Sequence, residues 1–378
     1  MITELFPDAK NDWAKEKTSL ARVPAQLYSQ RISLFCAPSK QRSPSVGNDT
    51  LSFCVAGGGS WGTALAHLAA SNGHDVTLYL RNAAVCDAIN TKHENPAYLS
   101  GCPIHPAVRA SVNPDVLSAP FVILAIPCQM QRAFLTANRE RFAKGAVIIN
   151  VAKGIELSTL RTGSSFIPEI LADRDIMYAV LSGPSFAREV MHNRPTAVVI
   201  ASRYAKVAET VQRALSCTFF RCYASSDVLG VEIGGAVKNI VAIAAGLCDG
   251  LGIGSNGRAA LVTRGLAEIS RLGTAMGALP QTFMGLSGLG DLVLTTTGDL
   301  SRNRQVGLGL GQGRSLEQVT KEIGMVTEGV KTSFAVHELA LKLHVSVPIT
   351  DAVCDILNGK LTPSDAALQL MQRHLRSE

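Results

Sequence analysis

The chain has 378 residues, of which 47% are hydrophobic and 17% are charged, and it carries a formal net charge of +6. A chain of this length is expected to form two domains with separate cores, and its composition argues against a largely disordered protein. Aromatic residues make up only 5% of the chain, and no basic stripe with interleaved aromatics occurs, so nucleic-acid binding is not expected.

Residues 1–50 differ from the rest of the chain. From Lys17 to Gly47 there is no acidic residue, and basic residues are mixed with serines, which is the composition of a transit peptide. The alternative is a disordered or loosely docked extension, and four acidic residues near the start favour it: Glu4, Asp8, Asp12 and Glu16. We therefore expect a cytoplasmic protein, with an organelle as the less favoured location.

A glycine-rich turn follows the first predicted strand, Leu51–Ala56. Gly57, Gly59 and Gly62 match the G-x-G-x-x-G pattern, in which one glycine makes the turn, one admits a pyrophosphate and one lets helix and strand pack closely. A helical pattern follows and ends at Asn72–Gly73, before a second predicted strand. The order of strand, glycine turn, helix and strand predicts a dinucleotide site.

Short apolar runs alternate with helical segments after residue 50, which is the pattern of a parallel sheet with crossover helices. The predicted strands are Leu51–Ala56, Val76–Leu80, Phe121–Ile126, Val147–Val151, Met177–Leu181 and Ala197–Ala201. From about Leu229 long helical segments replace them. We predict an α/β fold, with a Rossmann-type doubly wound dinucleotide-binding domain over residues 51–228 and a mostly α-helical substrate and catalytic domain over residues 229–378.

One helical segment carries a lysine where none is expected. Between Gly234 and Leu247 only Lys238 and Asn239 are polar, so the helix should be buried. Burial lowers the pKa of a lysine toward the range useful for proton transfer, and such a lysine needs a cavity or an anion. The alternative is a lysine whose stem reaches the surface.

Two further segments follow predicted strands at the carboxyl edge of the sheet, where ligands of open α/β sheets bind. Lys153 comes just after Val147–Val151, and Gly183 turns the chain after Met177–Leu181. Ser185 can cap the next helix and offer its start to an anion. A solvated lysine and simple capping are the alternative interpretations.

The stretch from Gly285 to Arg304 joins glycines, one acid and a polar cluster. Asp291 stands among apolar residues, so a cationic partner is expected, and Lys238 is the obvious candidate. Ser301, Arg302 and Asn303 suit a phosphate, although they also read as a surface helix start. The glycine-rich run after them lacks a preceding strand and is interpreted as a connector, followed by a capping box of Ser315 and Gln318.

Cysteines and histidines do not form a recognisable site. The nine cysteines are odd in number and contain no C-x-x-C pair, and the eight histidines have no H-E-x-x-H spacing, so neither a disulfide framework nor a metal is expected. The most apolar stretch, Val228–Leu251, contains Glu232, Lys238 and Asp249, and we expect no transmembrane segment.

From about Leu51 to its end, the chain resembles the NAD(P)-dependent glycerol-3-phosphate dehydrogenases. Seven segments occur in the family's order: GGGSWGTALA, AKGIE, SGPSFA, GGAVKNI, GLGDL, SRN and TEG. Their number and spread make the resemblance specific, but the extension before Leu51 is not part of the shared pattern.

The resemblance implies interconversion of dihydroxyacetone phosphate and glycerol 3-phosphate with NAD or NADP, without a metal, which supplies glycerol phosphate for phospholipid synthesis. Lys238 would be the proton-transfer residue, with Lys153 and Asp291 beside it. The implied substrate residues are Lys153, Gly183, Ser185, Lys238, Asp291, Thr295, Ser301, Arg302 and Asn303. The implied dinucleotide contacts, besides the glycine turn, are Ser60, Trp61, Arg81, Lys153, Ala187, Arg302, Val326 and Glu328. A homodimer is kept as an expectation.

The end of the second strand bears on the choice of cofactor. Strictly NAD-specific domains carry an acid there that holds the ribose hydroxyls. Here the strand Val76–Leu80 ends in Arg81, while Asp75 lies at its other end and Asp87 in the next helix. We therefore expect NADPH to be accepted.

Two other functions remain open from the residues alone. The fold could serve as a dinucleotide-sensing module without catalysis, or the enzyme could reduce a 2-keto or 3-hydroxy acid. A sensor needs neither the proton donor Lys238 nor the phosphate clamp Arg302. The second alternative gives no reason for the Ser-Arg-Asn cluster beside Asp291.

Overall fold

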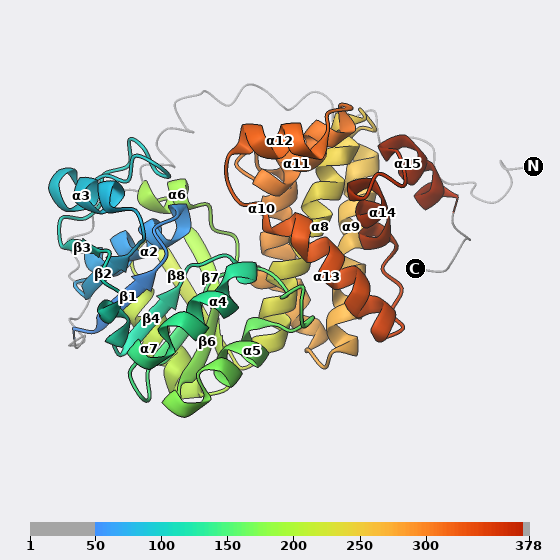
Figure 1. Cartoon of the computed structure of the whole chain (residues 1–378). Helices are drawn as coiled ribbons and strands as arrows, with labels where there is room; N and C mark the ends of the chain where they lie inside the picture. Colours follow the sequence, from blue (N-terminus) through green and yellow to red (C-terminus); the bar gives the residue numbers. More distant parts are fainter. Residues whose placement is uncertain (1–49, 373–378) are drawn as a thin grey trace, which may run out of the picture. The chain divides into compact units, whose positions relative to one another are not determined.

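The sheet of this protein is seen in a computed structural model that describes residues 50–372. Within this part of the chain, one sheet has the strand order β3-β2-β1-β4-β5-β6-β7-β8 (Figure 1). The strands are β1 Ser52–Ala56, β2 Asp75–Tyr79, β3 Val108–Ser111, β4 Phe121–Leu124, β5 Val147–Asn150, β6 Met177–Ser182, β7 Thr196–Ser202 and β8 Phe220–Ser225. The predicted extension lies, except for residue 50, outside the described residues.

The strand order confirms the doubly wound fold. The chain runs from β1 outward through β2 and β3, then returns to the other side of β1 with β4. The order therefore reverses between β1 and β4, and ligands of open α/β sheets bind at such a reversal, beyond the carboxyl ends of the strands. All neighbouring strands are parallel except β6 and β7, so the predicted parallel sheet is confirmed apart from one antiparallel pair.

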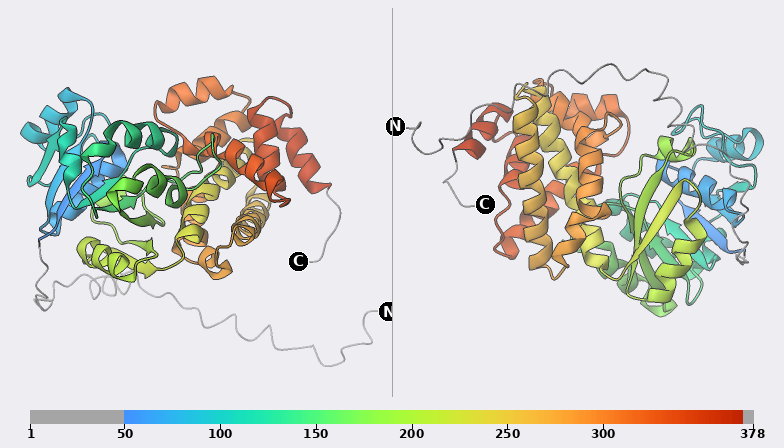
Figure 2. Two further views of the ribbon diagram at one scale, coloured as in Figure 1. Left: turned by 60° about the horizontal axis from the view of Figure 1, so that its bottom comes forward. Right: turned by 180° about the vertical axis from the view of Figure 1, so that it is seen from behind.

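Helices cover both faces of the sheet (Figure 2). Alternate residues of each strand point to opposite faces, so Phe53 and Val55 pack in one core and Cys54 and Ala56 in another. The sheet is accompanied by the helices α2 Ser60–Ser71, α3 Ala83–Lys92, α4 Cys128–Asn138, α5 Gly163–Ile170, α6 Ala187–Met191 and α7 Ala205–Leu215. The predicted end of the first helix is confirmed, since Asn72 is the C-cap of α2.

The rest of the described chain is helical, as predicted. Its helices are α8 Val228–Gly250, α9 Ser255–Ala275, α10 Asp291–Thr297, α11 Arg302–Gly311, α12 Leu316–Ile323, α13 Glu328–Lys342, α14 Pro348–Leu357 and α15 Pro363–Met371. The capping box of Ser315 and Gln318 is confirmed. The glycine-rich run before it is not a connector, because Gly307, Gly309 and Gly311 belong to α11.

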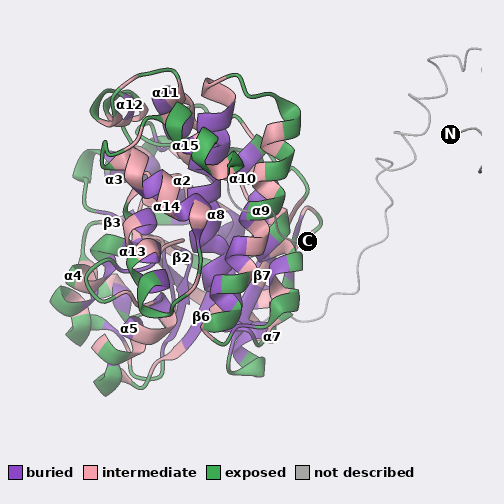
Figure 3. Cartoon of the chain, turned by 90° about the vertical axis from the view of Figure 1, so that its right-hand side faces the viewer, coloured by how far each residue is buried: buried purple, intermediate pink, exposed green. Residues whose placement is uncertain are grey.

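Helix α8 lies at the centre of the helical part, and most of its residues are buried (Figure 3). By length and composition alone it could span a membrane, but 94% of its most apolar window is buried inside the protein. It is therefore a core helix. The described residues belong to one compact unit, and the division into two domains at residue 228 stays a prediction.

Candidate active site

The glycine turn after β1 has one glycine for each of the expected tasks. Gly57 has a φ of 123°, and a Cβ there would lie 2.5 Å from the carbonyl oxygen of Ala125. A Cβ at Gly62 would lie 2.0 Å from the carbonyl oxygen of Gly57, so this residue lets α2 pack on the turn. Gly59, in contrast, has no neighbouring atom within 4 Å of a built Cβ, and its backbone is open to a ligand.

The start of α2 also fits a pyrophosphate. Gly59 is its N-cap, and no side chain caps this helix end, so N–H groups of its first turn are available to an anion. Ser60 donates a hydrogen bond to the carbonyl oxygen of Tyr98 at 3.1 Å, and Trp61 packs against the core. Arg81, two residues after the end of β2, is exposed and lies at the same edge of the sheet as the glycine turn, because β1 and β2 are parallel.

The predicted pair of Lys238 and Asp291 is present, and a second lysine joins it. The Asp291 carboxylate accepts a hydrogen bond from Lys238 Nζ at 2.6 Å and another from Lys153 Nζ at 2.6 Å. Lys238 also donates to Thr295, and Lys153 donates to the carbonyl oxygen of Gly183 at 3.1 Å. One buried carboxylate therefore holds two ammonium groups from different parts of the chain.

Burial controls the chemistry of Lys238. Desolvation lowers its pKa from 10.5 to about 8, the nearby charge of Asp291 opposes this shift, and the charge of Lys153 adds to it. A lysine that titrates near neutral pH can give up and take back a proton. The prediction that this lysine is buried, rather than reaching the surface, is confirmed by its 5% exposure.

Two glycines before Lys238 bring α8 close to its neighbours. A Cβ at Gly235 would lie 2.7 Å from Ser182 Oγ at the end of β6, and a Cβ at Gly234 would lie 2.7 Å from the carbonyl oxygen of Ser287. Ser287 belongs to a π-helical turn, Leu286–Gly290, that leads directly into Asp291. The glycine pair therefore lets the lysine helix approach both the sheet and the segment that carries the carboxylate.

The predicted Ser-Arg-Asn cluster forms the first turn of α11. Ser301 is the N-cap, and its Oγ accepts a hydrogen bond from the backbone N–H of Arg304 at 3.3 Å. Arg302 donates to the carbonyl oxygen of Val326 at 3.1 Å, and Asn303 Oδ1 accepts from the backbone N–H of Gly329 at 3.1 Å. The cluster is a helix start, as the alternative interpretation held, and it is also joined to the residues just before α13 and to the first turn of that helix.

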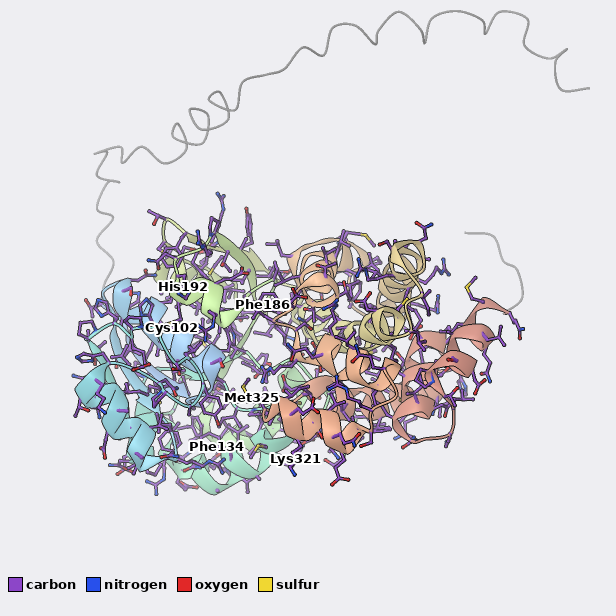
Figure 4. The ribbon with its side chains drawn as sticks, turned by 90° about the horizontal axis from the view of Figure 1, so that it is seen from above. Cys102, Phe134, Phe186, His192, Lys321 and Met325 are labelled. Carbon is purple, nitrogen blue, oxygen red and sulfur yellow. The ribbon has the colours of Figure 1, made fainter. Side chains whose placement is uncertain are left out.

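Glu328, the first residue of α13, links this segment to the sheet. Its carboxylate accepts hydrogen bonds from the backbone N–H groups of Cys128 at 2.9 Å and Lys153 at 3.3 Å. Burial raises the pKa of Glu328, and these two N–H groups oppose the shift. In Figure 4, Met325 and Phe186 both lie where the sheet and the helical part meet. The segment around Glu328 thus connects Lys153, which follows β5, with the Ser-Arg-Asn cluster at the start of α11.

The interpretation of Ser185 as a helix cap was wrong. Helix α6 begins at Ala187, its N-cap is Phe186, and no side chain caps it. The Ser185 hydroxyl donates instead to the carbonyl oxygen of Gly183 at 3.0 Å, because the chain is still extended after the turn at Gly183. Ser185 therefore shares an acceptor with Lys153 at the carboxyl end of β6.

Two polar residues of α8 have roles that the sequence analysis missed. Asn239, which is 5% exposed, lies 3.5 Å from the carbonyl oxygen of Lys153. Glu232 accepts hydrogen bonds from Tyr178 at 2.6 Å and from the backbone N–H of Ser164 at 2.8 Å. Their polarity within an apolar helix was the available signal. Within residues 50–372, no group of three His, Cys, Asp or Glu side chains could hold a metal ion.

Comparison with known proteins gives a consistent result over both parts of the chain. Residues 52–208 match the family model described as NAD-dependent glycerol-3-phosphate dehydrogenase N-terminus, and residues 227–368 match the model of the C-terminus. A relative from Desulfovibrio desulfuricans, named glycerol-3-phosphate dehydrogenase, NAD(P)+, is 56% identical over 330 residues, which cover 87% of this chain and 99% of the relative. Another of the same name, from Lawsonia intracellularis, is 52% identical over 337 residues, which cover 86% and 95% of the two chains.

A solved structure is similar over the same region. The crystal structure of glycerol-3-phosphate dehydrogenase from Coxiella burnetii aligns with a TM-score of 0.81 and 36% sequence identity, and it covers 86% of this chain and 99% of that chain. The alignment thus includes the sheet with its glycine turn and the helical part with its buried lysine.

Proposed function

The chain belongs to the NAD-dependent glycerol-3-phosphate dehydrogenase family, and on this premise we propose that it interconverts dihydroxyacetone phosphate and sn-glycerol 3-phosphate. The single observation that carries the proposal is the buried Lys238, bonded to Asp291 and Thr295 beside Lys153. A dinucleotide sensor has no use for a proton donor of this kind, whereas reduction of a ketone requires one.

We propose NAD or NADP as cofactor, held by the glycine turn with Ser60, Trp61 and Arg81 on one side and by residues such as Ala187 and Val326 on the other. When bound, the nicotinamide supplies the hydride that reduces C2 of the substrate. The openness of Gly59 and the uncapped start of α2 support this role.

Lys238 moves the proton in this proposal. As hydride reaches C2, negative charge develops on the carbonyl oxygen, and the Lys238 ammonium donates its proton to that oxygen. In the reverse direction the neutral amine accepts the proton of the substrate hydroxyl. Asp291 orients Lys238 and Lys153, and Lys153 adds positive charge near the oxygen.

Ser301, Arg302 and Asn303 bind the substrate phosphate in this proposal, with Gly183 and Ser185 at the sheet edge. The guanidinium of Arg302 can form two charge-assisted hydrogen bonds to a phosphate. The product, glycerol 3-phosphate, would serve phospholipid synthesis. We further propose that the protein forms a homodimer and is located in the cytoplasm. Light scattering on the purified protein tests the oligomeric state.

The test of the activity follows the absorbance of NADH or NADPH with purified protein. We expect oxidation of the reduced cofactor with dihydroxyacetone phosphate, and much less with unphosphorylated dihydroxyacetone or with a 2-keto acid such as pyruvate. Equal rates with pyruvate and dihydroxyacetone phosphate would overturn the proposal.

A further inference from the structure

Helices α8 and α11 touch through glycines over their whole shared length. On α8, a Cβ at Gly246 would lie 2.0 Å from the carbonyl oxygen of Arg304, and a Cβ at Gly250 would lie 2.6 Å from that of Leu308. On α11, a Cβ at Gly307 would lie 1.9 Å from the carbonyl oxygen of Ile243. Each distance is far below van der Waals contact, so no residue with a side chain fits without separating the helix backbones.

This contact lies next to the predicted phosphate-binding turn. Arg304, whose carbonyl oxygen meets Gly246, is in the first turn of α11, and its backbone N–H is capped by Ser301. The Arg304 side chain also pairs with Asp249 of α8 at 2.7 Å. The backbone and the side chain of one residue therefore both tie the start of α11 to α8.

The same turn is also bonded to α13, which packs closely on α8 beside the buried lysine. Asn303 accepts a hydrogen bond from the backbone N–H of Gly329 at 3.1 Å. A Cβ at Gly329 would lie 2.6 Å from Asn303 Oδ1 and 3.0 Å from the carbonyl oxygen of Asn239. Asn239 is the residue after Lys238, so a glycine fills the narrow space between the turn and the lysine's own segment of α8.

We propose that the glycines at the α8–α11 contact, above all Gly246, are positioning residues that set the distance between the proton-transfer lysine and the phosphate-binding turn. This inference rests on the proposed function. Gly246 lies eight residues after Lys238, about 12 Å along the helix, and does not touch the substrate. It acts through the backbone of α11, and it thereby determines how strongly the enzyme prefers phosphorylated over unphosphorylated substrate.

The expected effect follows from the geometry. An alanine at Gly246 moves the Arg304 carbonyl oxygen by more than 1 Å to reach ordinary contact, and Ser301 and Arg302 move with it. A misplacement of about 1 Å can cost roughly a hundredfold in rate. Because unphosphorylated dihydroxyacetone does not use this turn, the loss falls mainly on dihydroxyacetone phosphate.

The test compares the ratio of kcat/KM for dihydroxyacetone phosphate to kcat/KM for dihydroxyacetone. We expect Gly246→Ala to lower this ratio roughly tenfold or more, mostly through KM for the phosphorylated substrate. The matched control is Gly309→Ala on α11, whose Cβ would instead meet the side chain of Val319 at 2.4 Å, away from α8. It should leave the ratio unchanged even if it lowers the unfolding temperature.

A change of unfolding temperature in Gly246→Ala with an unchanged ratio would overturn the inference, since it would mean a purely structural role. If Gly246→Ala does not fold, Gly250→Ala decides, because it widens the same α8–α11 contact through a milder clash, 2.6 Å from the carbonyl oxygen of Leu308. A lowered ratio supports the inference, and an unchanged ratio overturns it. A wild-type protein that shows no preference for the phosphorylated substrate would instead contradict the proposed function.

Discussion

Lys238 is buried, with 5% of its surface exposed, and yet it lies among charged side chains. Its ammonium meets Asp291 and Thr295, and the ammonium of Lys153 lies on the same carboxylate. Burial and the second positive charge favour the neutral amine, while Asp291 favours the protonated form. The balance of these effects places the pKa of Lys238 at about 8, where both forms are populated near neutral pH.

This balance predicts opposite pH profiles for the two directions of the reaction. Reduction uses the protonated ammonium, so its rate with saturating substrate should fall as pH rises through about 8. Oxidation uses the neutral amine, so its rate should rise over the same range. Steady-state rates measured in both directions with one buffer series check this.

Lys238→Met is the control for the pH profiles. It should lower turnover by roughly a hundredfold or more and remove the pH dependence near 8, while cofactor binding, followed by fluorescence titration, stays intact. A variant with near-normal turnover would exclude Lys238 as the proton donor.

Arg302 should determine the preference for a phosphorylated substrate. It is exposed at the start of α11, and one of its nitrogens donates to the Val326 carbonyl oxygen, so the other guanidinium N–H groups can reach a phosphate. Arg302→Ala should lower kcat/KM for dihydroxyacetone phosphate far more than for dihydroxyacetone. Equal losses on the two substrates would remove Arg302 from the phosphate site.

Arg81 should favour the use of NADPH. It follows β2 without an acidic neighbour at the strand end, because Asp75 lies at the opposite end of β2, paired with Arg109. A guanidinium there can pair with a 2′-phosphate, whereas an acid would repel it. Arg81→Asp should depress kcat/KM with NADPH more than with NADH. The two cofactors are compared in wild type and variant, and an unchanged ratio would place Arg81 outside the cofactor site.

Several site residues were predictable from the sequence because each broke a local pattern. Lys238 and Asp291 are charged residues within apolar segments. Burying an unpaired charge is costly, so the two residues were expected to pair with each other. The pairing of Lys153 with the same carboxylate was not predictable, since an exposed loop lysine has the same local sequence. Ser185 was misread because a serine before a short helix usually caps it, and only the path after Gly183 shows that it does not.

At the scale of elements, two glycines of the turn after β1 should respond differently to substitution, because Gly57 is needed for the backbone path and Gly59 for access of the ligand. Gly57→Ala forces a backbone with positive φ and a clash with Ala125, and such strain costs about 1–3 kcal/mol. It should lower the unfolding temperature. Gly59→Ala adds a methyl group into open space, so it should leave the unfolding temperature unchanged but weaken NADH binding.

Calorimetric unfolding and cofactor titration on the two variants test this division. The opposite pattern, a destabilised Gly59→Ala protein that binds NADH normally, would show that no pyrophosphate approaches Gly59. Gly309→Ala on α11 is the reference for the NADH titration, because Gly309 lies outside the dinucleotide-binding part of the chain.

The elements that the sequence did not predict share a physical cause. Strands β3 and β8 are edge strands in which buried and exposed residues alternate, so they lack the continuous apolar run that marked the central strands. The antiparallel direction of β7 depends on how the chain returns after α6, which strand composition does not encode. The glycines of α11 were taken for loop residues, because a glycine needed for close helix packing looks the same in sequence as one needed for a turn.

At the scale of the whole molecule, Glu232 joins the central helix to the sheet. Its carboxylate on α8 accepts hydrogen bonds from Tyr178 on β6 and from Ser164 on α5. Tyr178 in turn accepts from Asn150 at the end of β5 at 3.1 Å, three residues before Lys153. A buried polar network therefore connects the helix that carries Lys238 with the strand that leads to Lys153.

The same carboxylate predicts how stability depends on pH. Desolvation raises the pKa of Glu232 above its ordinary value of 4.5, although its hydrogen bonds oppose the shift. Between 4.5 and the raised pKa the folded state binds more protons than the unfolded state, so the contribution of Glu232 to stability is lost as pH rises through this window. Glu232→Gln cannot ionise, and its free energy of unfolding should therefore improve relative to wild type as pH rises.

Denaturant unfolding of both proteins from pH 4.5 to neutral pH measures this difference. Glu209→Gln on α7 is the matched control, because it makes the same chemical change at an exposed position. A flat difference for Glu232→Gln would mean that Glu232 keeps an ordinary pKa. Its hydrogen bonds to Tyr178 and Ser164 would then fully offset the cost of burying the charge, and the link between helix and sheet would be equally strong at every pH in the range.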